Sequence, residues 1–164
     1  MTQTQATPEA GAASAAGTNT DRVLTITRQF AAPIEAVYRA WTDPKQLAVW
    51  WGPESVTTPH CETDLREGGR WRTCMRMPDG SEMWVGGVYR EVAPPDRLAF
   101  TWAWDQEDGS RGHETLVEIE LTANDGGTEL RLTQSLFQDS EACKLHNEGW
   151  TSSFVCLDTH IAEG

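Results

Sequence analysis

Five segments between residues 70 and 136 alternate apolar and polar residues, and short turn sequences separate most of them. They are RWRTCMRM, SEMWVGGVYREV, RLAFTWAW, HETLVEIEL and TELRLTQSL, at residues 70–77, 81–92, 97–104, 113–121 and 128–136. Alternation with a period of two is typical of strands that bury one face. The pattern therefore predicts an antiparallel meander whose apolar face is covered on one side only.

The cover is predicted to be a helix over residues 138–162. Trp150, Phe154, Leu157 and Ile161 are spaced i, i+4, i+7 and i+11, which places them on one helical face. A helix of this length can lie across several strands and bury their apolar side chains.

The segment before the meander predicts one strand and two short helices. RVLTITRQF at 22–30 alternates like a strand, and Pro33 is well placed in the first turn of a helix. Asp43 and Pro44 open a second helix, which Gly52-Pro53 ends before a loop that leads into the sheet. The complete order predicts an α+β fold in which a curved sheet encloses the C-terminal helix.

Composition narrows the classes of partner. The formal net charge of −12 disfavours binding to nucleic-acid phosphates or anionic membrane surfaces. No apolar stretch approaches the ~18 residues of a membrane span, and the four cysteines have no zinc-finger spacing. We expect a cytoplasmic protein without metal or other cofactor, with a disordered tail at 1–20 and one domain at 21–164.

The order of elements resembles the helix-grip, START-like superfamily (SRPBCC), to which the birch pollen allergen belongs. Several strings are similar to the group named for the activator of the heat-shock protein 90 ATPase. They are FAAPIEAVYRAWTDPKQLAVWWGP, DLREGGRW, MRMPDG, GGVYREVAPPDRLAFTWAW, GGTELRLTQSLF and HNEGW. The resemblance extends roughly over residues 22–162.

This resemblance implies a stand-alone bacterial domain with a link to the stress response. The eukaryotic co-chaperone has an additional N-terminal domain that grips the chaperone, with an Asn-x-Asn-x-Trp-His-Trp signature and an Arg-Lys-x-Lys motif. Neither string occurs in this chain, so the expected match is to the C-terminal domain alone. The wider superfamily includes hydrophobic-ligand binders, polyketide aromatase/cyclases and self-sacrificing resistance proteins.

The implied fold leaves a cavity between the sheet and the long helix. A dry void of about 300 Å³ would cost about 7 kcal/mol, close to the whole stability of a typical domain. The cavity must therefore be filled by large side chains, hydrated, or occupied by a ligand. The residues expected to line it are Trp71, Thr73, Met75, Val85, Tyr89, Phe100, Trp102, Val117, Gln134, His146, Trp150 and Phe154. Two interpretations stay open: these residues fill the core, or they form a pocket for a flat apolar ligand.

Thr73, Tyr89, Gln134 and His146 bring polar groups to the same faces. A buried polar group needs a partner, which can be backbone, water or a ligand. His146 is the best candidate for acid–base chemistry, because the unperturbed pKa of histidine lies near neutrality. A satisfied structural role is the alternative for His146 and for Tyr89, and we assign no catalytic residue.

The sequence therefore predicts a domain that binds a small hydrophobic or aromatic molecule, as a monomer or weak homodimer. One alternative is a chaperone-related protein-interaction module, which exposed Trp84 and Leu116 on the outer sheet face would favour. Another alternative is a cyclase- or hydrolase-like enzyme that uses His146 or Tyr89.

Overall fold

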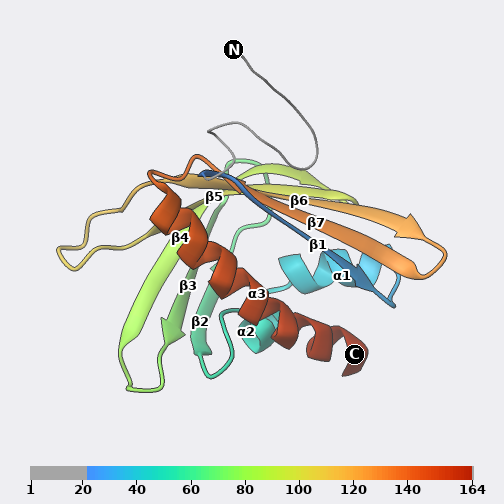
Figure 1. The fold of residues 1–164 in the computed structure, drawn as a ribbon, viewed down its shortest axis with the longest axis horizontal. Coiled ribbons are helices and arrows are strands. Elements are labelled where there is room, and N and C mark those ends of the chain that lie inside the picture. Colours follow the sequence, from blue (N-terminus) through green and yellow to red (C-terminus); the bar gives the residue numbers. More distant parts are fainter. Residues whose placement is uncertain (1–21, 164) are drawn as a thin grey trace, which may run out of the picture.

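The computed structural model describes residues 22–163, so the tail expected at 1–20 lies outside the described residues. Seven strands form one antiparallel sheet in the order β1-β7-β6-β5-β4-β3-β2. The elements are β1 (Leu24–Phe30), α1 (Ile34–Thr42), α2 (Pro44–Trp50), β2 (Thr57–Thr63), β3 (Arg70–Arg76), β4 (Glu82–Ala93), β5 (Arg97–Trp104), β6 (Thr115–Asn124), β7 (Gly127–Ser135) and α3 (Ser140–Glu163). The sheet curls around α3, and the predicted α+β helix-grip fold is confirmed (Figure 1).

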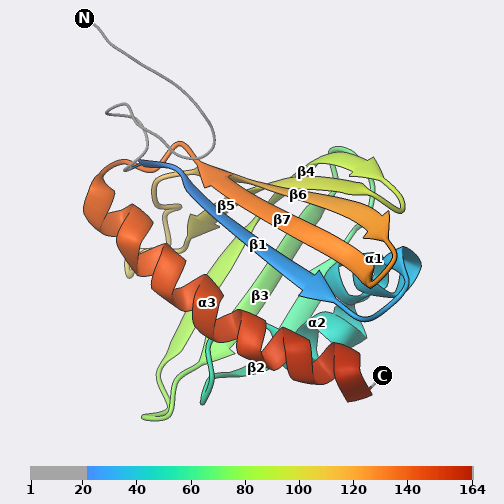
Figure 2. The same ribbon diagram turned by 45° about the vertical axis from the view of Figure 1, so that its right-hand side comes forward.

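The long helix α3 runs diagonally across the concave side of the sheet (Figure 2). Trp150, Phe154 and Leu157 are buried on its inner face, and Ile161 is partly buried near its end. The helical stripe in the sequence therefore identified the buried face of α3.

The two short helices pack together at one end of the sheet. Asp43 caps α2, since its carboxylate accepts a hydrogen bond of 2.9 Å from the backbone N–H of Lys45. The indole Nε1 of Trp50 donates to the carbonyl of Ala40 at 2.8 Å and ties α2 to α1. This pair of helices supplies the buried Trp41 and Trp50 rings to the core.

One strand was not expected from the sequence. The segment after Gly52-Pro53 was predicted to be a loop, but Thr57–Thr63 forms β2 and pairs with β3. The sequence TTPHCET has no regular alternation of large apolar residues, and it contains Pro59. Both features suit a strand at the edge of a sheet, where a missing N–H leaves no partner unpaired.

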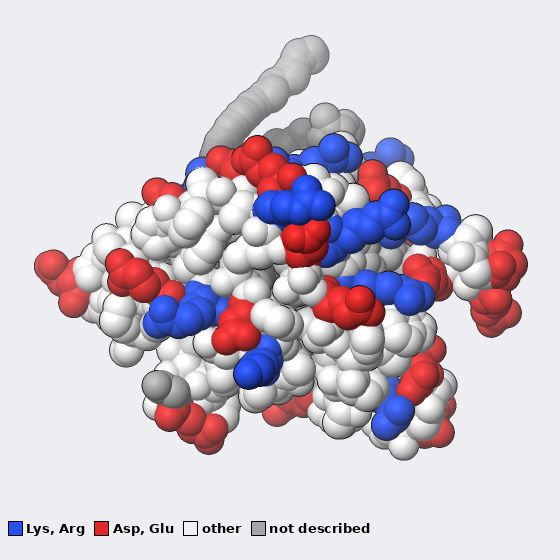
Figure 3. Space-filling model, turned by 180° about the vertical axis from the view of Figure 1, so that it is seen from behind, with Lys and Arg blue, Asp and Glu red and all other residues white. Residues whose placement is uncertain are grey.

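The outer face of the sheet is less simply polar than the alternation predicted. Ala99 in β5 is buried although it points away from α3. Its neighbours in register are Glu91 and Glu118, and the Arg97 guanidinium reaches both carboxylates, at 3.0 and 3.8 Å. These long side chains cover the small one, and Figure 3 shows basic and acidic side chains intermixed on the side seen from behind.

Candidate functional site

Tryptophans fill the deep part of the space between sheet and helices. Seven of the eight form a connected cluster of ring contacts, of which the shortest joins Trp41 and Trp50 at 4.7 Å between centroids. A void of about 10 Å³ remains beside Trp41, Trp51 and Trp71, which is about the room of one water molecule. The cavity is therefore collapsed at this end.

An open cleft remains at the other end, with a volume of about 330 Å³. It lies between the N-terminal half of α3, the strands β3 to β5 and the connection from α2 to β2. The residues that line it are Trp51, Gly52, Pro53, Val56, Met75, Met77, Met83, Trp102, Trp104, Leu145, His146, Gly149 and Trp150. Nearly all of these side chains are apolar, so the cleft suits a ligand with little polar surface.

Three methionines form one wall of the cleft. Met75 and Met83 are register partners on β3 and β4, and Met77 follows at the end of β3. Unbranched thioether side chains adapt to ligands of irregular shape. Met83 is 43% exposed and Leu145 on the opposite wall is 57% exposed, so the rim of the cleft presents apolar surface to solvent.

His146 forms part of the α3 wall, and both of its ring nitrogens are engaged. Nδ1 donates to the carbonyl of Ala142 at 2.8 Å, and Nε2 accepts from the indole Nε1 of Trp104 at 3.0 Å. These partners fix the neutral Nδ1–H tautomer. Burial lowers the pKa of His146, and the hydrogen bond to the Ala142 carbonyl offsets only part of that shift. The imidazole is therefore held as a neutral, aromatic part of the wall.

Gln134 is completely buried away from the cleft. Its Nε2 donates to Thr115 Oγ1 at 2.8 Å, and its Oε1 accepts from Trp150 Nε1 at 2.8 Å. The amide thus anchors Trp150, which lines the cleft, and its own hydrogen bonds are made within the protein. Tyr89 is also buried, and burial raises the pKa of its phenol well above the usual range.

The structure separates the twelve predicted lining residues into three groups. The cleft contains Met75, Trp102, His146 and Trp150. The collapsed end contains Trp71, Thr73, Tyr89 and Phe100. The packed core contains Val85, Val117, Gln134 and Phe154, each completely buried.

Nine lining residues of the cleft were not in the predicted set: Trp51, Gly52, Pro53, Val56, Met77, Met83, Trp104, Leu145 and Gly149. Met77 and Met83 carried a usable signal, because they continue the inward alternation of Met75 and Val85. Gly149 carried none, since a glycine within a helical pattern gives no indication of what faces it.

The buried indole N–H groups of Trp51 and Trp102 have no hydrogen-bond acceptor among residues 22–163. The Trp51 ring meets those of Trp71 and Trp150 nearly edge-on, with interplanar angles of 75° and 89°. Edge-to-face contacts bring the positive edge of one ring against the π face of another, which stabilises the packing of Trp51 in the cluster.

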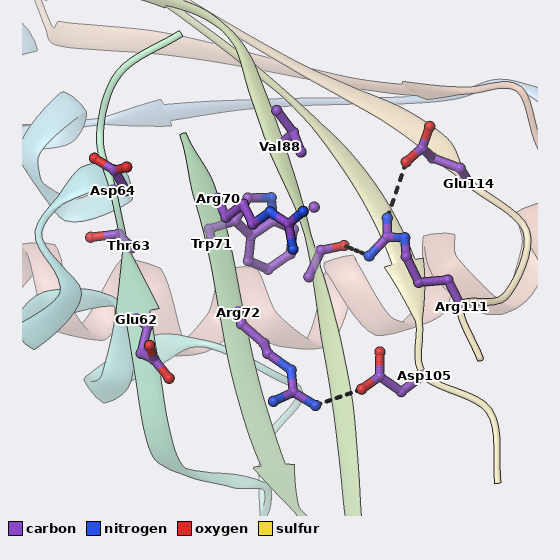
Figure 4. Close-up of a pocket in the computed structure, with 12 residues that line it drawn as sticks. Glu62, Thr63, Asp64, Arg70, Trp71, Arg72, Val88, Asp105, Arg111 and Glu114 are labelled. Carbon is purple, nitrogen blue, oxygen red and sulfur yellow. Dashed lines mark hydrogen bonds and ion pairs between the residues drawn. The ribbon is translucent and has the colours of Figure 1, made fainter. Parts of the chain in front are cut away.

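A second hollow of about 590 Å³ lies on the outer face of the sheet, beside Gly86 and Gly87 (Figure 4). Arg72 reaches across it to Asp105 at 2.6 Å, and Arg111 pairs with Glu114 at 3.0 Å. These side chains are partly exposed to solvent, and acidic residues accompany the arginines around the rim. Exposed and mutually neutralised charges bind anions weakly, so we place the candidate site in the apolar cleft.

Two further properties concern only the described part of the chain. No group of three His, Cys, Asp or Glu side chains within residues 22–163 is arranged to hold a metal ion. Over the same residues, no helix combines the length and the apolar character that crossing a membrane requires.

Known proteins share the sequence pattern and the fold of this chain. The family model described as activator of Hsp90 ATPase homolog 1-like protein matches residues 31–162. The AHSA1 protein of Silicibacter pomeroyi is 34% identical with a TM-score of 0.79, over 85% of this chain and 97% of that one. A protein of Nitrosomonas europaea is 26% identical with a TM-score of 0.74, over 87% and 96% of the two chains.

A third solved structure, from Rhodobacter sphaeroides, is 26% identical with a TM-score of 0.75, over 90% of this chain and 97% of that one. A search of curated proteins gave no match. The predicted resemblance is thereby confirmed at the level of family and fold.

Proposed function

The chain belongs to the activator of Hsp90 ATPase homolog 1-like family, and we propose that it binds a small, largely apolar molecule in the cleft between α3 and β3–β5. The observation that carries this proposal is the contrast between the two ends of the core. Tryptophans close one end to about 10 Å³, whereas the other end stays open at about 330 Å³.

The walls of the cleft favour binding by packing. Methionine and tryptophan side chains supply apolar contact area, and concave apolar surface open to solvent is typical of ligand sites. A ligand that covers Met83 and Leu145 would remove exposed apolar surface from water, and this transfer is favourable.

We propose binding without catalysis at this site. His146 is the one titratable side chain among the lining residues, and both of its nitrogens already have partners within the described structure. A histidine that acts as general acid or base needs a ring nitrogen that can reach the reacting group. Tyr89 lies at the collapsed end, outside the cleft.

The test is a titration with N-phenylnaphthylamine, a neutral probe whose fluorescence rises in apolar surroundings, together with fatty acids, sterols and flat polyphenols. Three of the four methionines line the cleft, so isotope-labelled methionine methyl groups report occupancy directly, and labelled leucine methyl groups supply a control in the packed core. We expect saturable shifts of the Met75, Met77 and Met83 methyl signals, and no shift of Leu130 in the packed sheet. Absence of saturable binding by every compound would refute the proposal.

A second candidate is a co-chaperone-like contact with an Hsp90-type chaperone. The exposed apolar rim at Met83 and Leu145 favours it, because a protein segment could cover the same surface. The outer face of the sheet does not favour it, since Trp84 is half-buried beneath the Arg72 guanidinium, 4.1 Å from the ring centroid, and Leu116 is half-buried. Calorimetry with the chaperone, repeated in the presence of N-phenylnaphthylamine, tests whether the two occupants compete.

A further inference from the structure

Gly149 lies in the interior of α3, where glycine is the least favourable residue apart from proline. Its backbone is helical and has no positive φ, so any amino acid can adopt it. A glycine in this position therefore needs a reason other than backbone conformation.

Close packing does not supply that reason. A Cβ atom built on Gly149 would have no neighbouring heavy atom within 4 Å. By contrast, a Cβ on Gly87 in the sheet would lie 1.9 Å from the carbonyl oxygen of Thr101. Gly87 is required by the fold, whereas Gly149 leaves open space where a side chain would stand.

That open space belongs to the cleft. Gly149 lines it together with Leu145, His146 and Trp150, which follow one face of α3 at helical spacing. The missing side chain makes a notch between the His146 and Trp150 rings, opposite the methionine wall.

We infer that Gly149 determines which ligands the cleft accepts, because its missing side chain lets a ring of the ligand lie directly against the backbone of α3. This inference rests on the proposed function of the cleft. The ligand class it indicates is a molecule with a planar, unsaturated ring system, since aromatic side chains flank the notch and stack favourably on such rings.

The test compares Gly149→Ala and Gly149→Leu with Thr151→Ala and Thr151→Leu as matched controls. Thr151 is exposed on the same helix and does not line the cleft. The melting temperature of Gly149→Ala is expected to rise, because alanine favours the helix. Affinity for N-phenylnaphthylamine is expected to fall by about tenfold in Gly149→Ala, the effect of one extra methyl group in a filled pocket, and to be lost in Gly149→Leu.

The outcomes separate this inference from the proposed function. Binding that is equal in wild type and both Gly149 variants overturns the role of Gly149 but leaves ligand binding in the cleft intact. Equal losses in the Thr151 variants also overturn it, since they would reflect the helix rather than the notch. Failure of the wild-type protein to bind the probe in the cleft overturns both.

Discussion

Replacement of Gln134 by leucine distinguishes a structural amide from a ligand-binding one. Gln134 joins β7 to α3, because its Oε1 accepts from Trp150 Nε1 and its Nε2 donates to Thr115 Oγ1, each at 2.8 Å. Leucine has a comparable volume but makes neither bond. The Trp150 N–H would stay buried without an acceptor, whereas Thr115 would keep its bond to the Trp102 carbonyl.

The expected loss of unfolding free energy is about 2 kcal/mol, because one buried donor left unsatisfied costs about 1–3 kcal/mol. For a domain of this size, the melting temperature should fall by about 4–8 °C. Affinity for N-phenylnaphthylamine should stay within about twofold of wild type, since Gln134 does not line the cleft and a 1.4 kcal/mol change would be needed for a tenfold effect.

Urea denaturation measures the free energy of unfolding, and titration with N-phenylnaphthylamine measures the affinity, on the same samples. Trp150→Phe removes the N–H that Gln134→Leu leaves unpaired, so the double variant should lose less stability than the sum of the single variants. A fully stable Gln134→Leu protein that has lost probe affinity would refute the structural role and assign the amide to the ligand.

Three other perturbations test separate parts of the structure. Burial lowers the pKa of His146, so the unfolded chain takes up a proton before the folded protein does as the pH falls below about 6.5. The free energy of unfolding measured in urea should therefore decline towards pH 5. The decline should be less steep in His146→Phe. Gly87→Ala should destabilise by about 3 kcal/mol, because its Cβ would clash with the Thr101 carbonyl, while Gly126→Ala, with ordinary contacts, should change little in thermal melts. Arg97→Ala should cost about 1 kcal/mol in urea, since its ion pairs are partly exposed and screened by solvent, and a much larger loss would contradict that interpretation.

The sequence was sufficient for those elements whose periodicity is strong. The alternation over residues 70–136 identified β3 to β7, and the stripe that includes Trp150 and Phe154 identified α3 and its buried face. β2 escaped prediction because it has no fully buried side chain and so no alternating apolar face, whereas the other edge strand, β1, buries Leu24, Ile26 and Phe30. Pairing with β3, a tertiary contact, defines that strand.

The site was only partly predictable, for a different reason. Alternation shows that Trp71 and Met75 both point inward, but it does not show that one lies at the collapsed end and the other in the open cleft. That difference depends on where rings from other elements meet, above all Trp41 from α1 and Trp51 after α2. The residue types were correctly placed inside, while the division of the interior is a property of the assembled fold.

The distribution of side-chain shape explains why one end of the core is closed and the other is open. A closed, dry space of 330 Å³ would cost about 8 kcal/mol at ~24 cal/mol per Å³, more than most domains can lose. The cleft avoids this cost by opening to solvent beside Met83 and Leu145. Water against such apolar walls is held weakly, and its release is what an apolar ligand gains on binding. Under the proposed function, the ring cluster around Trp41 and Trp50 stabilises the fold, and the methionine wall and Gly149 contact the ligand. Trp51 lines both spaces and contributes to both.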